Sequence, residues 1–392
     1  MTLQERDVGM LIRITNTPRP YAWGSTTAIA DLLGTAASGG PEAELWLGSH
    51  PGSPSRIVDG AAESDLAQWA AAHAPGGRLP FLLKVLAASA PLSLQVHPTA
   101  AQARDGFARE NAAGIPLDAP ERNYRDDQPK PELIVALSDP FRALCGFRPT
   151  SDARADLASV GDARLDPLVS RLGSDDALPG VLRWLLQRDE EVAGVVAALS
   201  EHAAAAAGDE RGLWLGTVRM LAEHHPGDPG IAISTLLHTL LLRPGEALYL
   251  PAGNIHAYLE GLGIELMAAS DNVLRGGLTP KHVDAAELVR VVDARPLPAP
   301  YLEAEHPRPG VSIYSPGVPE FRLAIVEGAA LAEGVELASE GIAVLLCIEG
   351  AAVVDGADAL GRGEAALVEG RAVRIAGEGR VVIATGRHPE PQ

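Results

Sequence analysis

Apolar and polar residues alternate strictly in the stretch LSLQVHP, residues 92–98. Three aliphatic residues share one face, so Ser93, Gln95 and His97 share the other. A period of two predicts a strand with one buried face and one polar face. This polar face carries no charged side chain and ends in Gln-x-His, which is unusual for a face that only meets water. The strand therefore directs an amide and an imidazole the same way.

The apolar pattern changes twice along the chain. Residues 1–148 mix turns with short runs of strand character, and such runs return after residue 230. Between them, residues 149–230 are rich in Ala and Leu and carry charges at helical spacing, which predicts a unit of several helices. From residue 311 onward, turn residues separate short apolar runs about every 8–12 positions, which is typical of a β-sandwich or barrel.

Composition narrows the class of protein. With 41 Gly and 31 Pro in 392 residues, the chain favours turns and short strands over long helical bundles. The net charge of −19 argues against non-specific binding to nucleic acid or to an anionic membrane. Cys145 and Cys347 make no disulfide framework, and no apolar run approaches the ~18 residues of a membrane span. The opening MTLQERDVGM lacks the pattern of a secretory leader, so we expect a soluble cytoplasmic protein.

The stretch GEALYLPAGNIH has the most specific spacing. Five residues separate Gly245 from Pro251, and Gly253 and His256 follow in the pattern Gly-x5-Pro-x-Gly-x2-His. A Pro-x-Gly turn directs the histidine that follows it into the barrel, where a neutral imidazole can bind a metal. The spacing resembles the second motif of the cupins, which are double-stranded jelly rolls.

We therefore predict a mainly β fold with two cupin-like jelly-roll β-sandwich domains and an α-helical domain. The catalytic domain is expected to comprise residues 1–148 with 231–310, the helical insertion 149–230, and a degenerate cupin-like domain 311–392. Residues 280–292 predict a further helix, and the Pro-rich stretch after it predicts a linker or crossing segment. The C-terminal part has Glu-Gly where the metal motif has Pro-x-Gly, and no histidine follows, so we expect no metal there.

A metal site is predicted where two such motifs meet. Gln95 and His97 are the only match to the first cupin motif, and Glu132 in KPELIVAL is the candidate carboxylate on a separate strand. Gln95, His97, Glu132 and His256 would hold one divalent ion, Zn²⁺ by their ligand types, with a position open for water or substrate. A single inward histidine is more often an ordinary core residue, but two in motifs of the expected spacing favour the metal.

Lysine is rare, and its positions are informative. Of 32 basic residues 29 are Arg, and the three lysines are Lys84, Lys130 and Lys281. Lys84 precedes the Gln95 strand, Lys130 lies beside the predicted carboxylate ligand, and Lys281 follows Arg275 in the glycine-rich stretch RGGLTPK. A basic cluster near a metal in an acidic protein suits an anion such as phosphate. The alternative for Arg275 and Lys281 is a capped loop with surface charges.

These segments resemble the type I phosphomannose isomerases (mannose-6-phosphate isomerases). The similarity covers most of residues 18–290, and its last segment is the most specific. The helical stretch and the residues after 311 resemble the family mainly in layout. In chain order, the similar segments are RPYAWGS, ELWLGSHPGSPS, PFLLKVLAASAPLSLQVHP, NYRDDQPKPELIVAL, PAGNIHAYLEG and SDNVLRGGLTPKHVD.

The resemblance implies a zinc enzyme that interconverts mannose 6-phosphate and fructose 6-phosphate and feeds mannose and GDP-mannose metabolism. It implies one zinc per chain, held by the four ligands named above, and a small sugar phosphate as the partner. Arg275 matches the family's active-site arginine, and Lys84 and Lys130 match lysines of its pocket. Further positions close to substrate are matched by Trp23, Ser93, Tyr258 and Glu265.

The implied chemistry is aldose–ketose exchange through a cis-enediol. A base removes the proton from C2 of the aldose, and the proton returns at C1. Zinc with a single carboxylate ligand keeps a net positive charge, and with Arg275 it would stabilise the enediolate oxygen. The base is either Glu265, with a pKa raised by burial, or Lys130, with a pKa lowered beside the metal. Lys84, Lys281 or both would hold the phosphate.

Three other functions are compatible with parts of the sequence. An Fe²⁺ cupin oxygenase would usually use two histidines and one carboxylate, which the glutamine ligand and the basic cluster disfavour. A non-catalytic sugar-phosphate-binding cupin would keep the pocket without turnover. An isomerase of broader range, acting also on glucose 6-phosphate, contradicts no motif. The sequence does not fix the oligomeric state, and we expect a monomer.

Overall fold

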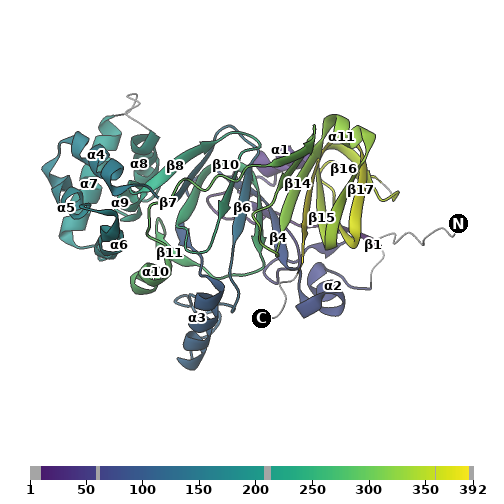
Figure 1. The fold of residues 1–392 in the computed structure, drawn as a ribbon, viewed down its shortest axis with the longest axis horizontal. Coiled ribbons are helices and arrows are strands. Elements are labelled where there is room, and N and C mark those ends of the chain that lie inside the picture. The colour runs from purple at the N-terminus through teal and green to yellow at the C-terminus, as the bar shows by residue number, and fades with distance from the viewer. Residues whose placement is uncertain (1–9, 59–61, 207–212, 358, 388–392) are drawn as a thin grey trace.

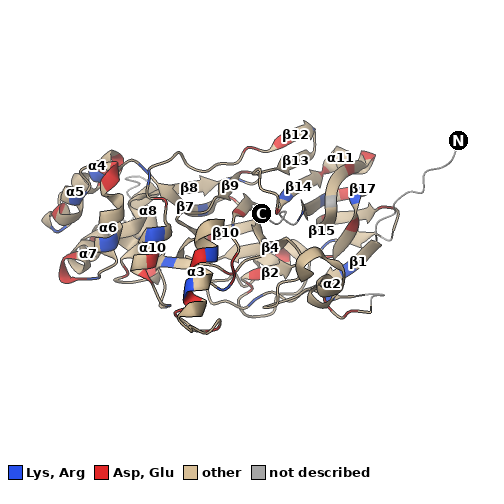
Figure 2. Cartoon of the chain, turned by 60° about the horizontal axis from the view of Figure 1, so that its bottom comes forward, with Lys and Arg blue, Asp and Glu red and all other residues tan. Residues whose placement is uncertain are grey.

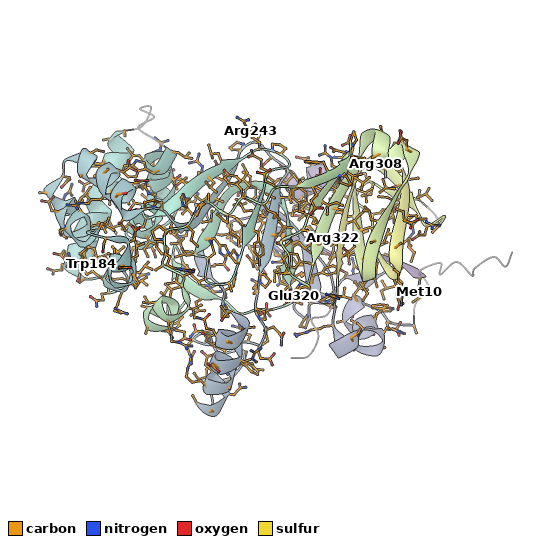
Figure 3. The ribbon with its side chains drawn as sticks, in the orientation of Figure 1. Met10, Trp184, Arg243, Arg308, Glu320 and Arg322 are labelled. Atoms are coloured by element: carbon orange, nitrogen blue, oxygen red, sulfur yellow. The ribbon has the colours of Figure 1, made fainter. Side chains whose placement is uncertain are left out.

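The computed structural model describes residues 10–58, 62–206, 213–357 and 359–387. The opening stretch, for which the absence of a leader pattern was predicted, lies almost entirely outside them. A helical unit lies at one end, a curled sheet in the middle and a second sheet at the other end (Figure 1). Trp184 in the helical unit and Met10 near the opposite end mark this long axis in Figure 3. The predicted mainly β fold with a helical insertion is confirmed.

The middle sheet is built around one long strand, β10, and has nine strands among the described residues. β10 pairs with β5 and β7 near its start and with β4 and β6 along its second half, always antiparallel. One strand shared between two layers curls the sheet into a sandwich with an enclosed interior. The strands are β2 (Glu44–Leu47), β4 (Phe81–Ala88), β5 (Leu94–Val96), β6 (Glu132–Ala136), β7 (Phe141–Phe147), β8 (Leu237–Leu242), β9 (Ala247–Leu250), β10 (His256–Ala268) and β11 (Leu274–Gly277).

The helical unit packs on the outer face of the layer formed by β5, β7 and the start of β10. Leu94, Leu144 and Ala257 point away from the sandwich interior and join the apolar cluster of the helices. Burying each of the two leucine side chains contributes about 1.5–3 kcal/mol, so the helices are firmly attached behind the strands of the site. The helices are α4 (Thr150–Val160), α5 (Asp166–Arg171), α6 (Leu178–Leu185), α7 (Glu190–Ala205), α8 (Leu213–His224) and α9 (Gly230–Ser234), with short 3₁₀ turns at Ala163–Leu165 and Asp175–Ala177.

The second sheet combines both ends of the described chain. Strand β1 pairs with β17, with Ile14 opposite Ala365, and β3 pairs with β1. Two strands of the segment 1–148 are therefore hydrogen-bonded to the C-terminal sheet, so this segment contributes strands to both sheets. The interior of this sheet is aliphatic, with Leu345 and Val368 among its fully buried residues. The strands are β1 (Met10–Thr15), β3 (Arg56–Ile57), β12 (Glu305–Arg308), β13 (Val311–Tyr314), β14 (Arg322–Glu327), β15 (Val335–Val354), β16 (Leu360–Gly361) and β17 (Ala365–Gly386).

Several short helices cover the sheets. The helix predicted over 280–292 is present as α10 (Ala285–Val291), whereas α3 (Ala100–Ala112) was not predicted. α3 begins at a capping box between Thr99 and Gln102, and it packs on α10 with charges of both signs along the contact (Figure 2). No helix within the described residues is long and apolar enough to cross a bilayer. The remaining helices are α1 (Ala28–Leu33), α2 (Leu66–His73), a 3₁₀ turn at Pro75–Gly77 and α11 (Gly328–Glu333).

Candidate active site

The predicted metal ligands come from three strands that meet at one end of the sandwich. Gln95 lies on β5 and His97 follows that strand, while Glu132 begins β6 and His256 begins β10. His256 lies opposite Gln95 in the antiparallel pairing of β10 with β5. The N–H of Gly253, whose φ is 84°, donates to the carbonyl of His97 at 2.8 Å. The backbone thus joins the two motifs that the sequence keeps about 160 residues apart.

Three of these side chains form a compact buried cluster. Nε2 of His97 lies 3.2 Å from Oε1 of Glu132, and Nε2 of His256 lies 3.2 Å from Oε2 of the same carboxylate. The ligand atoms of His97, Glu132 and His256 all lie within 4.8 Å of one another, and no residue of the three is more than 4% exposed. Gln95 lines the same cavity, as does Lys130, whose ammonium is 2.9 Å from Oε1 of Glu132.

The histidines are held in the protonation state that a metal requires. Nδ1 of His97 lies 2.8 Å from the carbonyl of Asn272, and Nδ1 of His256 lies 3.1 Å from the carbonyl of Asn254. Because a carbonyl can only accept, Nδ1 carries the proton in each ring and Nε2 keeps its lone pair. Burial lowers the pKa of His97 to about 4, so this imidazole stays neutral. Burial alone would raise the pKa of Glu132, but the Lys130 ammonium beside it holds the pKa well below its usual range.

The surroundings of His97 Nε2 show whether a metal fits at this site. It is buried and makes no hydrogen bond to any described residue, although a carboxylate oxygen lies 3.2 Å away. A buried lone pair that faces a carboxylate is unfavourable unless a cation lies between them. Two neutral imidazoles, one carboxylate and one neutral amide match the ligand types of zinc. The residues therefore fit the predicted metal.

A second group of charges fills the opposite wall of the cavity. The ammonium of Lys84 on β4 lies 2.9 Å from Oε2 of Glu265 and 3.6 Å from Oε1 of Glu44. Trp46 Nε1 donates to Glu44 at 2.9 Å, and its ring lies under the Lys84 ammonium. Burial would lower the pKa of Lys84, but Glu265 and Glu44 raise it, so the lysine is charged. Burial raises the pKa of Glu265 even though Lys84 opposes the shift.

Unpaired positive charge gathers at the remaining side. Arg275 on β11 lies opposite Gln95, and no described carboxylate forms an ion pair with it or with Lys281. Burial lowers the pKa of Arg275, and Arg125 lowers it further. Burial also lowers the pKa of Lys281, with added effects of Arg275 and Arg125. Such mutual repulsion is relieved when an anion binds between the cations.

The cavity itself is small and polar, with a volume of about 180 Å³. The predicted residues that line it are Gln95, Glu132 and His256 of the metal set together with Lys84, Lys130, Tyr258, Glu265 and Arg275. Trp23, Ser93 and Lys281 are not among its lining residues: Trp23 packs at the edge of the cluster that includes Tyr258, and Lys281 lies beyond Arg275. His97 is not among the lining residues either, but it belongs to the metal cluster that borders the cavity.

Comparison with known proteins identifies the family. Residues 11–150 match the family model described as phosphomannose isomerase type I, catalytic domain. The chain is 40% identical over 352 residues to the mannose-6-phosphate isomerase of Salmonella typhimurium, covering 86% of this chain and 88% of that protein. The human mannose-6-phosphate isomerase is 33% identical over 373 residues, covering 84% and 85%. The chain belongs to the type I phosphomannose isomerase family.

Solved structures of mannose-6-phosphate isomerases agree with this family assignment. The Salmonella typhimurium enzyme bound to its substrate fructose 6-phosphate and zinc is 36% identical and superimposes with a TM-score of 0.86. The superposition covers 96% of this chain and 100% of that one. The resemblance inferred from the sequence, the cupin-like fold class and the isomerase class are therefore confirmed.

Several residues of this phosphomannose isomerase site escaped the sequence analysis. Glu44 and Trp46 lie in ELWL, where a period of two places both on the face that lines the cavity. This alternation could have predicted them as site residues. His50 and Asp271 also line the cavity, and Nε2 of His50 lies 3.0 Å from Oδ1 of Asp271. No local sequence pattern predicts that His50 and Asp271 pair, because the two residues are 221 positions apart.

Asn272 is the most connected of the missed residues. Its backbone carbonyl accepts from His97, and its side-chain oxygen accepts from the N–H groups of Arg125 and Asp126 at 2.7 and 3.2 Å. Its amide donates to the carbonyls of Asp126 and Gln128, each at 2.8 Å. The fully buried Asn272 thus ties the loop before Lys130 to the orientation of a metal ligand.

Proposed function

We propose that this cavity interconverts mannose 6-phosphate and fructose 6-phosphate, with one zinc ion per chain. The observation that carries the proposal is the buried cluster of two histidines and one carboxylate at a small cavity that Arg275 also lines, with Lys281 near Arg275 just outside that lining. Zinc is the metal bound in the family's solved structures, and the substrate-bound one holds fructose 6-phosphate. The geometry supports the same chemistry here.

The metal would be held by Gln95, His97, Glu132 and His256. Bound there, zinc supplies positive charge that polarises the oxygens at C1 and C2 of the open-chain sugar. The carbonyl groups of Asn254 and Asn272 keep both imidazoles in the ligating tautomer. Lys130, at 2.9 Å from Glu132, limits the negative charge that the carboxylate brings to the site.

The phosphate is best assigned to Lys281 rather than to Lys84. Lys84 is buried and already engaged by Glu44 and Glu265, so its charge is neutralised locally. Lys281 has no carboxylate partner among the described residues and lies near Arg275, where an anion would relieve the repulsion. In this arrangement the phosphate binds near Arg275 and the sugar enters the cavity that Glu265 lines together with Glu132 and His256.

Glu265 is our choice for the base. A base must be ionised yet have a pKa near the working pH, and burial raises the pKa of this carboxyl. Glu265 takes the proton from C2, the C–H electron pair forms the C1–C2 double bond, and negative charge moves to the C1 oxygen. Arg275 is placed to stabilise that oxygen. The hydroxyl proton of the C2 oxygen then passes to the C1 oxygen, so the negative charge moves to the C2 oxygen. As the C2 carbonyl forms, the double-bond electron pair takes the proton back from Glu265 at C1, which completes the ketose.

A coupled assay tests the proposal directly. Metal-analysed protein is mixed with mannose 6-phosphate, and fructose 6-phosphate is followed with and without a chelator. We expect turnover that the chelator abolishes and added Zn²⁺ restores. Binding of mannose 6-phosphate without exchange of its C2 hydrogen would instead support a non-catalytic sugar-phosphate binder. Oxygen uptake by an Fe²⁺-loaded sample without isomerisation would support an oxygenase.

The proposal extends to the setting of the reaction in the cell. We expect a cytoplasmic monomer that feeds mannose and GDP-mannose metabolism and has no nucleic-acid or membrane partner. The net charge of −19 and two free, buried cysteines support this setting. Light scattering of the purified protein at several concentrations tests the monomer. Turnover measured in parallel with glucose 6-phosphate tests the substrate range.

A further inference from the structure

Asp228 reaches from the helical unit to the strand that carries Arg275. It lies in the loop between α8 and α9, within the stretch HHPGDPG, and only 8% of the residue is exposed. Its Oδ1 atom accepts from the N–H of Gly230 at 2.7 Å and from the N–H of Leu278 at 2.8 Å. Leu278 follows β11 directly. One carboxylate oxygen therefore joins its own loop to the end of an active-site strand.

The contact is close and leaves little freedom. A Cβ atom added to Gly277, whose φ is 125°, would lie 2.7 Å from Oδ1 of Asp228 and 3.1 Å from the backbone of Gly230. A Cβ atom on Gly230 would lie 2.7 Å from the side chain of Leu278. Glycine is required at both positions because the two backbones meet there. Leu278 itself has a φ of 54°, a left-handed conformation that a leucine adopts only where its surroundings hold it.

The hydrogen bond from the N–H of Leu278 to Asp228, called the tether below, lies just beyond the end of the pairing between β11 and β5. Pairing of β11 with β5 is irregular between Arg275 and Gly277, and it ends at Gly277 opposite Leu94. Leu278 comes next, three residues after Arg275 and three before Lys281. Without Asp228, the segment between Arg275 and Lys281 would lose the first hydrogen bond that holds its backbone after the end of β11.

We propose that Asp228 is a positioning residue that sets the placement of Arg275 and Lys281 for the phosphorylated substrate. The inference rests on the proposed function for the roles of those two cations. It assigns the helical insertion a part in catalysis, because the loop that carries Asp228 belongs to that insertion. The second oxygen of Asp228 pairs with Arg188 at 3.2 Å, but the Arg188 side chain is 48% exposed, so this pair is not the tether.

Three variants separate positioning from general stability. Asp228→Ala removes the acceptor, Asp228→Asn keeps an oxygen at the same place, and Arg188→Gln removes only the exposed ion pair. For Asp228→Ala we expect the KM for mannose 6-phosphate to rise and kcat to fall, each about 10-fold to 100-fold, with zinc content unchanged. Asp228→Asn should recover most of both parameters, and Arg188→Gln should resemble the wild type.

Binding of inorganic phosphate, measured by calorimetry, provides a readout without turnover. We expect Asp228→Ala to weaken it about 10-fold, which would hold even if the wild type proved inactive on mannose 6-phosphate and the proposed function failed. Wild-type KM, kcat and phosphate affinity in Asp228→Ala, with only a lower Tm, would overturn the inference. If Asp228→Ala does not fold, Gly277→Ala tests the same contact from the other side. Wild-type kinetics in that variant would also overturn it.

Discussion

Nε2 of His97 and Oε1 of Glu132 lie 3.2 Å apart in the interior of the protein without a hydrogen bond between them. A neutral imidazole offers a lone pair at this atom, and an ionised carboxylate offers another. Two buried acceptors at this distance repel each other, so the fold positions them at a cost that a bound cation would offset. The site is thus organised around an ion before any substrate enters.

Removing one of these ligands should release the metal. We expect His97→Ala to lose zinc and isomerase activity together, because the three remaining ligands, Gln95, Glu132 and His256, do not complete the four-coordinate site. His224→Ala is the matched control, since His224 is an exposed histidine on α8 whose hydrogen bond among the described residues stays within its own helix. Metal analysis after gel filtration measures the outcome. One zinc per chain in His97→Ala would remove this residue from the ligand set.

Asn272 should matter for the metal although it offers no ligand atom. We expect Asn272→Ala to weaken zinc binding about 10-fold to 100-fold, because its backbone carbonyl would no longer be fixed against His97. Competition with a chelating dye measures the affinity. Gln128→Ala serves as the control, because within the part of the chain that the structure describes this side chain bonds to the neighbouring Asp127 alone, on the surface of the same loop. Equal zinc affinities in the two variants would contradict the role given to Asn272.

The metal site was predictable because its residues follow local rules. A period of two put Gln95 and His97 on one face, and a turn of fixed spacing placed His256. Asn272 and Asp228 obey no such rule. Asn272 accepts from the His97 ring 175 positions away, and Asp228 accepts from the N–H of Leu278 50 positions away. Their importance depends on which loops meet, and that is decided by the packing of the whole fold.

The fold shows the same division. The alternating residues of MLIRIT predict a strand, but nothing in them says that Ile14 pairs with Ala365 rather than with a neighbour in sequence. The longer helices of the insertion, such as α7 with 16 residues, have enough length for their pattern to be read, whereas α1, with six residues, does not. Local periodicity thus identified the elements, and burial across distant segments chose their partners.

Lys84 should be needed for stability as well as for activity. Lys84→Met leaves the buried carboxylates of Glu44 and Glu265 without their shared cation, and breaking such a pair costs about 3–5 kcal/mol of unfolding free energy. The double variant Lys84→Met/Glu265→Gln should recover part of that loss, because one charge is gone. Urea unfolding measures both. Arg295→Gln, which removes an exposed pair with Asp293, should leave the midpoint unchanged.

Arg275 and Lys281 should have separable kinetic effects. We expect Arg275→Ala to lower kcat about 10²-fold or more while zinc stays bound, as for other groups that stabilise an oxyanion. Lys281→Ala should raise the KM for mannose 6-phosphate about 10-fold to 100-fold, the value of a charge-assisted hydrogen bond, with a smaller change in kcat. Lys281→Arg should recover most of the affinity. An unchanged KM in Lys281→Ala would show that another cation, not Lys281, binds the phosphate.

The pH dependence of kcat should reveal the base. Burial raises the pKa of Glu265, so this carboxylate is protonated at a higher pH than an ordinary glutamate. A base is active only when ionised, and kcat should therefore fall as the pH drops through this raised pKa.

Lys84 opposes that shift, so its removal gives the decisive comparison. In Lys84→Met the acidic limb should move to still higher pH, and in Glu265→Gln kcat should fall at every pH, about 10²-fold to 10⁴-fold. Glu260→Gln is the control, because this carboxylate lies on the same strand but pairs with Arg142 outside the cavity. An acidic limb that Lys84→Met leaves in place would exclude Glu265 and make Lys130 the base.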